Sequence, residues 1–181
     1  MKKIIISLIL IILLTSACAW YIFINNSANP KSIKTFDAKN STLTINNNTV
    51  TLVNGLSQIT AAPQSASMVT TKYFGNEAVG DLNGDGRPDI AFLVTQDGGG
   101  SGLFYYVIVA LAKSNGYKTT NAFYIGDRIA PQSTEIHPDS RELYVNFAER
   151  NKGEPMSTQP SVGATLFLKV TPNDTLEGLM N

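Results

Sequence analysis

Ten residues, Gly80 to Asp89, place side-chain oxygens at regular intervals, and this pattern restricts what the surrounding chain can form. Counted from Asp81, the oxygens fall at positions 1, 3, 5 and 9, on Asp81, Asn83, Asp85 and Asp89. A hard cation such as Ca²⁺ takes six to eight oxygen ligands at about 2.3–2.6 Å. Without an ion, two carboxylates 4 Å apart repel each other by about 4 kcal/mol at an effective dielectric constant of 20. The spacing therefore predicts a loop that binds a cation.

The residues between these side chains also suit a tight cation-binding loop. The backbone carbonyl of Arg87, at position 7, can supply a further ligand, and Gly86, at position 6, allows a sharp turn. In the helix–loop–helix calcium motif position 12 is a glutamate, whereas here it is Phe92. The segments on both sides of the loop are short, apolar and rich in residues that favour strands. The pattern thus indicates a calcium loop between two strands.

The pattern Asp-x-Asn-x-Asp-Gly-x-x-Asp at residues 81–89 resembles the calcium loop of FG-GAP and VCBS-type repeats. Such loops occur on integrin-like β-propeller blades and on many bacterial surface proteins, so the resemblance implies bound Ca²⁺. The chain has one copy of the motif, which argues against a complete propeller, whose blades recur at a fixed period. The alternative is an Asp-, Asn- and Gly-rich turn that holds no ion.

The rest of the chain alternates between strand-like runs and turns. The run at 103–111 is apolar, β-branched and aromatic throughout, which is typical of a central buried strand. Residues 55–67 contain Pro63 and many small side chains, and they are expected to be irregular. We predict an all-β fold, a largely antiparallel sandwich or partly open barrel of about nine short strands. The expected strands are 42–45, 49–52, 69–74, 89–95, 103–111, 121–125, 134–137, 142–147 and 162–170.

The N-terminal segment is the most apolar part of the chain. Residues 4–24 carry no charge, and as a helix they would extend about 31 Å, close to the thickness of a bilayer core. Lys2 and Lys3 precede the segment, and aromatic side chains lie near its far end. We therefore expect an N-terminal transmembrane helix at 1–24, a polar linker at 25–40 and a β-domain at 41–181.

Two other schemes for the N-terminal segment remain open. Ala17-Cys18-Ala19 satisfies the small-x-small rule for signal peptidase cleavage, and residues 14–18 resemble a lipobox in which Cys18 would carry the lipid. In each scheme the domain is expected outside the cytoplasm, because extracellular calcium modules work at about 10⁻⁴–10⁻³ M. We expect a single-pass protein of the bacterial cell membrane, with a lipoprotein or a secreted protein as the alternatives.

Charge and cysteine content exclude some classes of protein. The chain has 14 basic and 14 acidic residues, and beyond residue 24 the balance is 12 to 14, with no basic stripe. Nucleic acid is therefore not an expected partner. Cys18 is the only cysteine, so the chain forms no internal disulfide, and with a single histidine it lacks the ligands for a zinc site.

The order of segments is similar to that of small bacterial envelope proteins in which an anchor precedes one calcium-loop domain. The similarity carries no activity, and it implies a binding or structural module whose partner is an envelope protein or a glycan. The residues that carry it, besides the loop and the glycine-rich run at 97–102, are Phe74-Gly75-Asn76-Glu77-Ala78, Gly126-Asp127-Arg128 and Gly153-Glu154-Pro155-Met156.

The alternative function is a hydrolase that acts on cell-wall or polysaccharide material through two carboxylates. Glu77, Glu135, Glu149 and Glu154 are candidates, but nothing in the sequence singles out a pair. His137 precedes a proline at a turn and is expected to be structural. We therefore favour a binding module over an enzyme.

A second polar cluster is expected to tie loops together through ion pairs, and it comprises Asp127, Arg128, Glu149, Arg150 and Glu154.

Overall fold

The computed structural model describes residues 35–179, which form a short 3₁₀ helix and twelve β-strands. The elements are η1 (Ala38–Asn40), β1 (Thr42–Ile45), β2 (Asn48–Thr51), β3 (Leu56–Thr60), β4 (Met68–Gly80), β5 (Asp89–Asp97), β6 (Phe104–Lys113), β7 (Gly116–Thr119), β8 (Phe123–Asp127), β9 (Ala130–His137), β10 (Glu142–Glu149), β11 (Val162–Val170) and β12 (Leu176–Gly178). The named strands pair in antiparallel fashion throughout. The predicted all-β, antiparallel class is confirmed.

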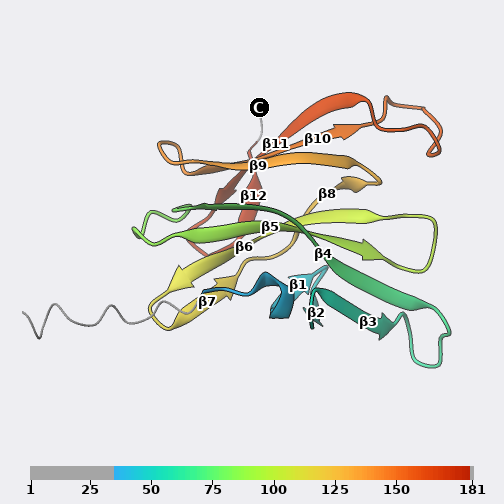
Figure 1. Ribbon diagram of the computed structural model, residues 1–181, viewed down its shortest axis with the longest axis horizontal. Helices are drawn as coiled ribbons and strands as arrows, with labels where there is room; N and C mark the ends of the chain where they lie inside the picture. Colours follow the sequence, from blue (N-terminus) through green and yellow to red (C-terminus); the bar gives the residue numbers. More distant parts are fainter. Residues whose placement is uncertain (1–34, 180–181) are drawn as a thin grey trace, which may run out of the picture. The chain divides into compact units, whose positions relative to one another are not determined.

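A six-stranded sheet lies at the centre of the domain, with five strands in the order β3-β4-β5-β6-β7 and β8 paired with β6 beside that path (Figure 1). Strand β6 is long enough to pair with β7 along its second half and with β8 along its first half. A second sheet has four strands in the order β12-β11-β10-β9, and β1 pairs with β2 in a separate hairpin.

The two middle strands of the central sheet are buried on both faces, which explains their continuous apolar sequence. Along β6, Val107, Val109 and Leu111 point into one hydrophobic core, and the alternate residues Ile108 and Ala110 point into another. All five side chains are fully buried. The prediction of a central buried strand at 103–111 is therefore confirmed, with β6 beginning at residue 104.

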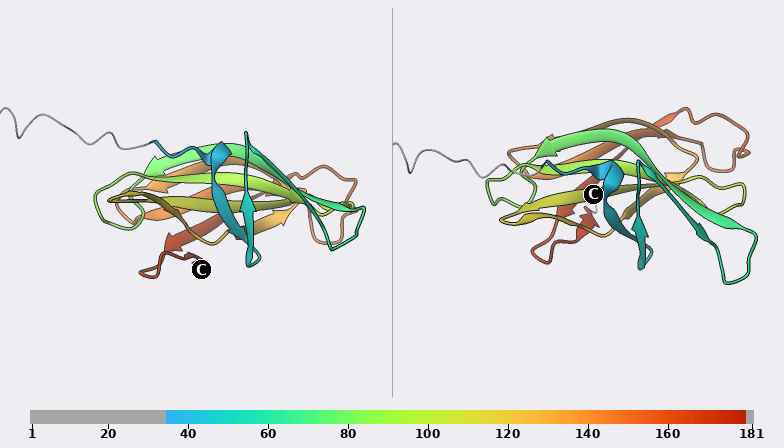
Figure 2. Two further views of the ribbon diagram at one scale, coloured as in Figure 1. Left: turned by 90° about the horizontal axis from the view of Figure 1, so that it is seen from below. Right: turned by 60° about the horizontal axis from the view of Figure 1, so that its bottom comes forward.

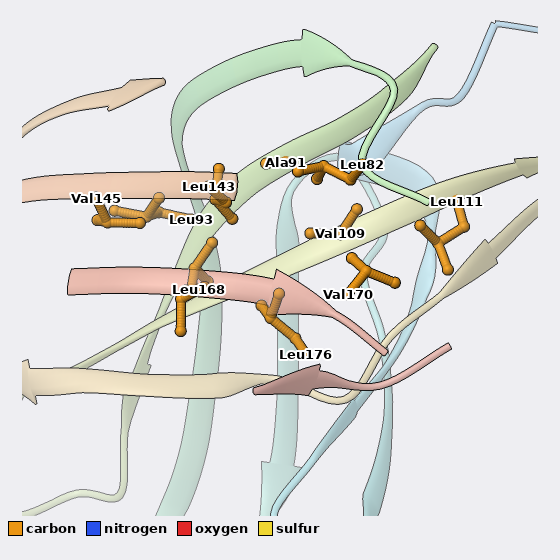
Figure 3. Packing of buried hydrophobic residues seen from close by; sticks show 11 residues of the cluster. Leu82, Ala91, Leu93, Val109, Leu111, Leu143, Val145, Leu168, Val170 and Leu176 are labelled. Carbon is orange, nitrogen blue, oxygen red and sulfur yellow. The ribbon is translucent and has the colours of Figure 1, made fainter. Parts of the chain in front are cut away.

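The first core lies between the central sheet and the four-stranded sheet (Figure 3). Leu143 and Val145 of β10 and Leu168 of β11 meet Leu93 of β5 and Val109 of β6. Strand β10 alternates buried and partly exposed residues, as expected for a strand with one face in the core. The outer layer thus covers one face of β5 and β6.

The β1–β2 hairpin covers the opposite face and crosses the central strands steeply (Figure 2). Its Leu43, Ile45, Val50 and Leu52 are buried, as the sequence predicts for the inward face. Asn46 has a φ of 49° and Asn47 a φ of 63°, left-handed values that a two-residue hairpin turn requires and that asparagine tolerates.

Residues 55–67 are not irregular throughout, so that expectation is wrong. Residues 56–60 form strand β3 at the edge of the central sheet, and they pair with β4 from Lys72 back to Met68. Strand β3 has a weak alternation and depends on its partner for its conformation, which explains why a local pattern did not reveal it. Strands β7 and β12 are also short and account for the rest of the difference from nine strands.

The compact β-domain begins at Phe36, within the segment expected to be a linker. The Phe36 ring lies 5.7 Å from that of Phe92 and 5.3 Å from that of Tyr117, and Ala38 is buried in the same core. The expected transmembrane helix at 1–24 lies outside the described residues. Within residues 35–179 no helix is long and apolar enough to cross a membrane.

Candidate metal centre

The candidate loop joins two neighbouring strands at one end of the central sheet. Strand β4 ends at Gly80 and β5 begins at Asp89, and these two residues are paired across the ladder. The intervening segment is therefore the closed end of a hairpin, as the sequence predicts. Residue 92 lies inside β5 with its side chain fully buried, so it is a core residue of the strand.

The loop wraps around the carboxylate of Asp81. One Asp81 oxygen accepts hydrogen bonds from the backbone N–H groups of Gly84 at 2.7 Å and Asp85 at 3.2 Å, and the other accepts one from Gly86 at 2.8 Å. Gly84 and Gly86 have φ values of 80° and 78°, in the left-handed region that glycine adopts readily. These turns bring the later residues of the loop back towards its first residue.

Asn83 and Asp85 lie beside that carboxylate. The Asn83 side-chain oxygen accepts the Asp85 N–H at 3.0 Å, and the Asn83 amide nitrogen is 3.4 Å from an Asp85 carboxylate oxygen. The hydrogen bonds thus bring together the first three of the four side chains that the spacing predicts as ligands. Their oxygens are of the type that Ca²⁺ prefers.

Arg87 contacts Asp85 through its side chain. Its guanidinium lies 3.0 Å from one Asp85 carboxylate oxygen, and the backbone N–H of Arg87 donates to the other oxygen at 3.0 Å. Burial acts to raise the pKa of Asp85, but the Arg87 hydrogen bonds and charge outweigh it, so that this pKa is lowered. The arginine charge would compete with a cation for this carboxylate, whereas the predicted ligand is the Arg87 carbonyl.

Asp89 is buried beneath the loop and connects it to the adjacent strand. Its side chain is fully buried, and it accepts backbone N–H groups from Leu82 at 2.9 Å and from Ala112 of β6 at 2.8 Å. Burial raises the pKa of Asp89 more than these hydrogen bonds lower it. In this geometry both oxygens of Asp89 anchor the loop to the central sheet.

The loop fits a hard cation by donor type, because three oxygen-bearing side chains gather around one turn of backbone. Within residues 35–179, no three His, Cys, Asp or Glu side chains are arranged so that they could hold a metal ion. The side chains that lie together in the loop are two carboxylates, Asp81 and Asp85, and the amide of Asn83. Asp89 is not among them, because its carboxylate points into the domain.

A hollow of about 650 Å³ adjoins the loop. Its walls come from the candidate loop, the β9–β10 turn, the end of β6 and the β11–β12 turn, all at the left in Figure 1. Three basic residues, Lys113, Arg141 and Lys169, line it. Sequence reasoning did not identify them, because they are far apart in the chain and belong to no common motif.

The second polar cluster joins loops through hydrogen bonds from Arg150 to backbone carbonyls, and its ion pair within residues 35–179 joins the sequence neighbours Asp127 and Arg128 rather than two loops. Arg128 pairs with Asp127 at 2.8 Å, and Asp127 also accepts the N–H of Leu103 at 2.9 Å. Arg150 donates to the carbonyl of Arg128 at 2.8 Å, and Glu154 accepts two hydrogen bonds from Asn151. These contacts hold the loop backbones in place.

The carboxylates considered for hydrolysis lie on separate elements. Glu77 is on β4 and accepts a hydrogen bond from Tyr73, whereas Glu135 is on β9 and Glu149 ends β10. None of the four glutamates lines the hollow beside the loop. His137 packs on the ring of Tyr144 with centroids 3.9 Å apart, which is a structural contact.

Comparison with protein-family models, curated proteins and solved structures gives no match to the chain. The similarity to FG-GAP and VCBS loops therefore rests on the motif at residues 81–89. Both the ion and the location that the motif implies stay predictions.

Proposed function

We propose that the loop at residues 81–89 binds one Ca²⁺ ion and that the domain is a binding module on the outer side of a bacterial membrane. The observation that carries this proposal is the wrapping of the loop around Asp81 by three backbone N–H groups. These hydrogen bonds hold the side-chain oxygens of Asp81, Asn83 and Asp85 close together. The proposed ligands are Asp81, Asn83, Asp85 and the carbonyl of Arg87, whereas Asp89, the fourth side chain that the spacing predicts, anchors the loop through both its oxygens.

The role of the ion is structural in this proposal. It would neutralise the carboxylates at the closed end of the β4–β5 hairpin, next to the point where Asp89 contacts β6. Calcium would thereby stabilise three strands of the central sheet. A binding role, for a glycan or an envelope protein, is supported by the hollow beside the loop.

The experiment is a thermal melt of the full-length protein in mild detergent, in chelator and in millimolar calcium. If Ca²⁺ binds the folded state alone, a free concentration of ten times Kd stabilises it by about 1.4 kcal/mol. Mg²⁺ should stabilise less, because it requires a tighter octahedron and gives up its waters reluctantly. Asp85→Ala should abolish the calcium effect and cost up to about 1 kcal/mol in chelator, because it also removes the partly exposed ion pair with Arg87.

The matched control is Glu149→Gln, which removes an exposed carboxylate outside the loop and should retain the full calcium response. Calorimetry with CaCl₂ gives the stoichiometry, expected to be one ion per chain. Equal wild-type melting temperatures in both buffers, with no heat of calcium binding, would reduce the loop to an ordinary turn.

A further inference from the structure

The hollow beside the loop, hereafter the loop-end hollow, is built by four chain segments and has a size typical of ligand sites. Its volume of about 650 Å³ lies within the range of about 300–1,000 Å³ seen for small-molecule pockets. Leu82 and Val170, both buried, form apolar parts of its lining, whereas Asn83, Ser140 and Thr171 contribute amide and hydroxyl groups. Such a lining suits a ligand that has both hydroxyl groups and apolar C–H surface.

Several charges in the loop-end hollow neutralise each other. Asp85 pairs with Arg87, and Asp174 lies 2.9 Å from both Lys113 and Lys118. These pairs account for two of the three acidic residues of the lining and for one of its three basic residues.

The two remaining basic side chains have no such partner. Neither Arg141 nor Lys169 forms an ion pair with any residue in the range 35–179, although Glu142 and Glu177 lie across the strand ladder from Lys169. One acidic residue of the lining, Asp139, is likewise without an ion pair inside that range. Among the lining residues, two basic groups and one acidic group are thus without an ion pair inside the described range.

The fold holds Arg141 against the candidate loop. Its φ is 56°, and its N–H donates to the carbonyl of His137 at 2.8 Å, which closes the β9–β10 turn. Its guanidinium packs over Gly84, so closely that a Cβ atom on residue 84 would lie 2.2 Å from Nη1. The turn and the missing side chain of Gly84 together position a planar donor group at the edge of the hollow.

We propose that the loop-end hollow binds the anionic group of an acidic sugar, a carboxylate or a phosphate, through Arg141 and Lys169. A guanidinium presents paired N–H donors that match either group, and an ammonium adds a point charge. The hydroxyl and amide groups of the lining contact the sugar hydroxyls. The inference names a ligand for the binding role proposed above, and it holds with or without Ca²⁺ in the neighbouring loop.

The test is calorimetry of the full-length protein in detergent with trigalacturonate, glucose 6-phosphate and neutral maltotriose as probes. Binding of either acidic probe, with maltotriose at least tenfold weaker, supports the proposal, and the stronger acidic probe identifies the carboxylate or the phosphate as the preferred group. Arg141→Asn keeps a residue that tolerates the left-handed turn and should weaken acidic binding about tenfold or more. Lys169→Gln should weaken it by a smaller factor, and Lys152→Gln, in the exposed β10–β11 loop, should leave it unchanged.

Each arm is run in chelator and in calcium, alongside calorimetry with CaCl₂ alone. Acidic binding without any heat of calcium binding would support this site and overturn the calcium loop. Calcium binding with no acidic binding, or equal binding of maltotriose, would overturn this site and leave the calcium loop intact. Unchanged acidic binding by a folded Arg141→Asn variant would also overturn it.

Discussion

At the scale of single residues, the candidate loop assigns different tasks to side chains that the motif treats alike. Asp81 and Asp85 face the loop backbone and remain partly accessible, whereas Asp89 is fully buried on two backbone N–H groups. The motif places all three at ligand positions. Their surroundings predict that loss of Asp85 affects calcium binding and that loss of Asp89 affects folding.

Asp89→Asn should destabilise the domain in chelator as well as in calcium. The amide would keep one acceptor, but it would point an N–H₂ group at the N–H of Leu82 or of Ala112. An unsatisfied buried polar group costs about 1–3 kcal/mol, and we expect a loss of that order in urea denaturation. If the variant lost stability only in calcium-containing buffer, Asp89 would act mainly as a calcium ligand and not as an anchor of the loop.

Arg87→Gln should tighten calcium binding, because it removes the guanidinium that lies 3.0 Å from an Asp85 oxygen and keeps the backbone carbonyl. The Arg87 side chain is 44% exposed, so solvent screening limits the gain to about 1 kcal/mol, or a few-fold in Kd. Arg87→Lys, which retains the charge, is the control and should change Kd less. The measurement is the Kd for Ca²⁺ by calorimetry. Weaker calcium binding by Arg87→Gln would show that the arginine side chain does not compete with the ion for Asp85.

At the scale of elements, local sequence patterns predicted the strands that are buried or regularly alternating. Strand β6 is apolar throughout because cores cover both its faces, and the β1–β2 hairpin has alternating residues around an asparagine turn. Strand β3 was missed because its pairing with β4 comes from tertiary structure. The loop-end hollow could not be predicted, since Lys113, Arg141 and Lys169 meet through the folding of distant segments.

The β11–β12 turn is held to the central sheet by a charge cluster, which predicts a pH-dependent stability. Hydrogen bonds from Lys118 and Lys113 lower the pKa of Asp174. The contribution of these ion pairs to the free energy of unfolding is therefore complete above the unfolded-state pKa of aspartate, about 3.9. It is lost as pH falls through the lower pKa that Asp174 has in the folded state.

Asp174→Asn should cost up to about 1 kcal/mol at pH 7, because both lysines are partly exposed, and less at pH 2. Asparagine tolerates the φ of 61° at this residue, so the variant tests charge without backbone strain. Urea denaturation at both pH values is the measurement, with Glu177→Gln as the control. An equal loss at pH 7 and pH 2 would show that the ion pairs do not stabilise the turn.

At the scale of the whole molecule, the β-domain from Phe36 onward is one compact unit. Two cores on opposite faces of the central sheet provide its stability, and the candidate loop and the loop-end hollow lie at one end of that sheet. The proposed anchor at 4–24 is separate from these features in sequence. The manner of membrane attachment can therefore be tested without disturbing the domain.

We predict that the protein stays in the membrane fraction after Cys18→Ser. Residues 4–24 carry no charge and are long enough to span a bilayer as a helix, so a lipid on Cys18 is not needed for attachment. The measurement is fractionation of cells that express the wild type or the variant, with the intact mass of each purified chain. Full-length mass and membrane retention for both chains are the expected result. A soluble variant beside a membrane-bound wild type with a lipidated N-terminal cysteine would instead establish a lipoprotein, and cleavage of both chains before the domain would establish a secreted protein.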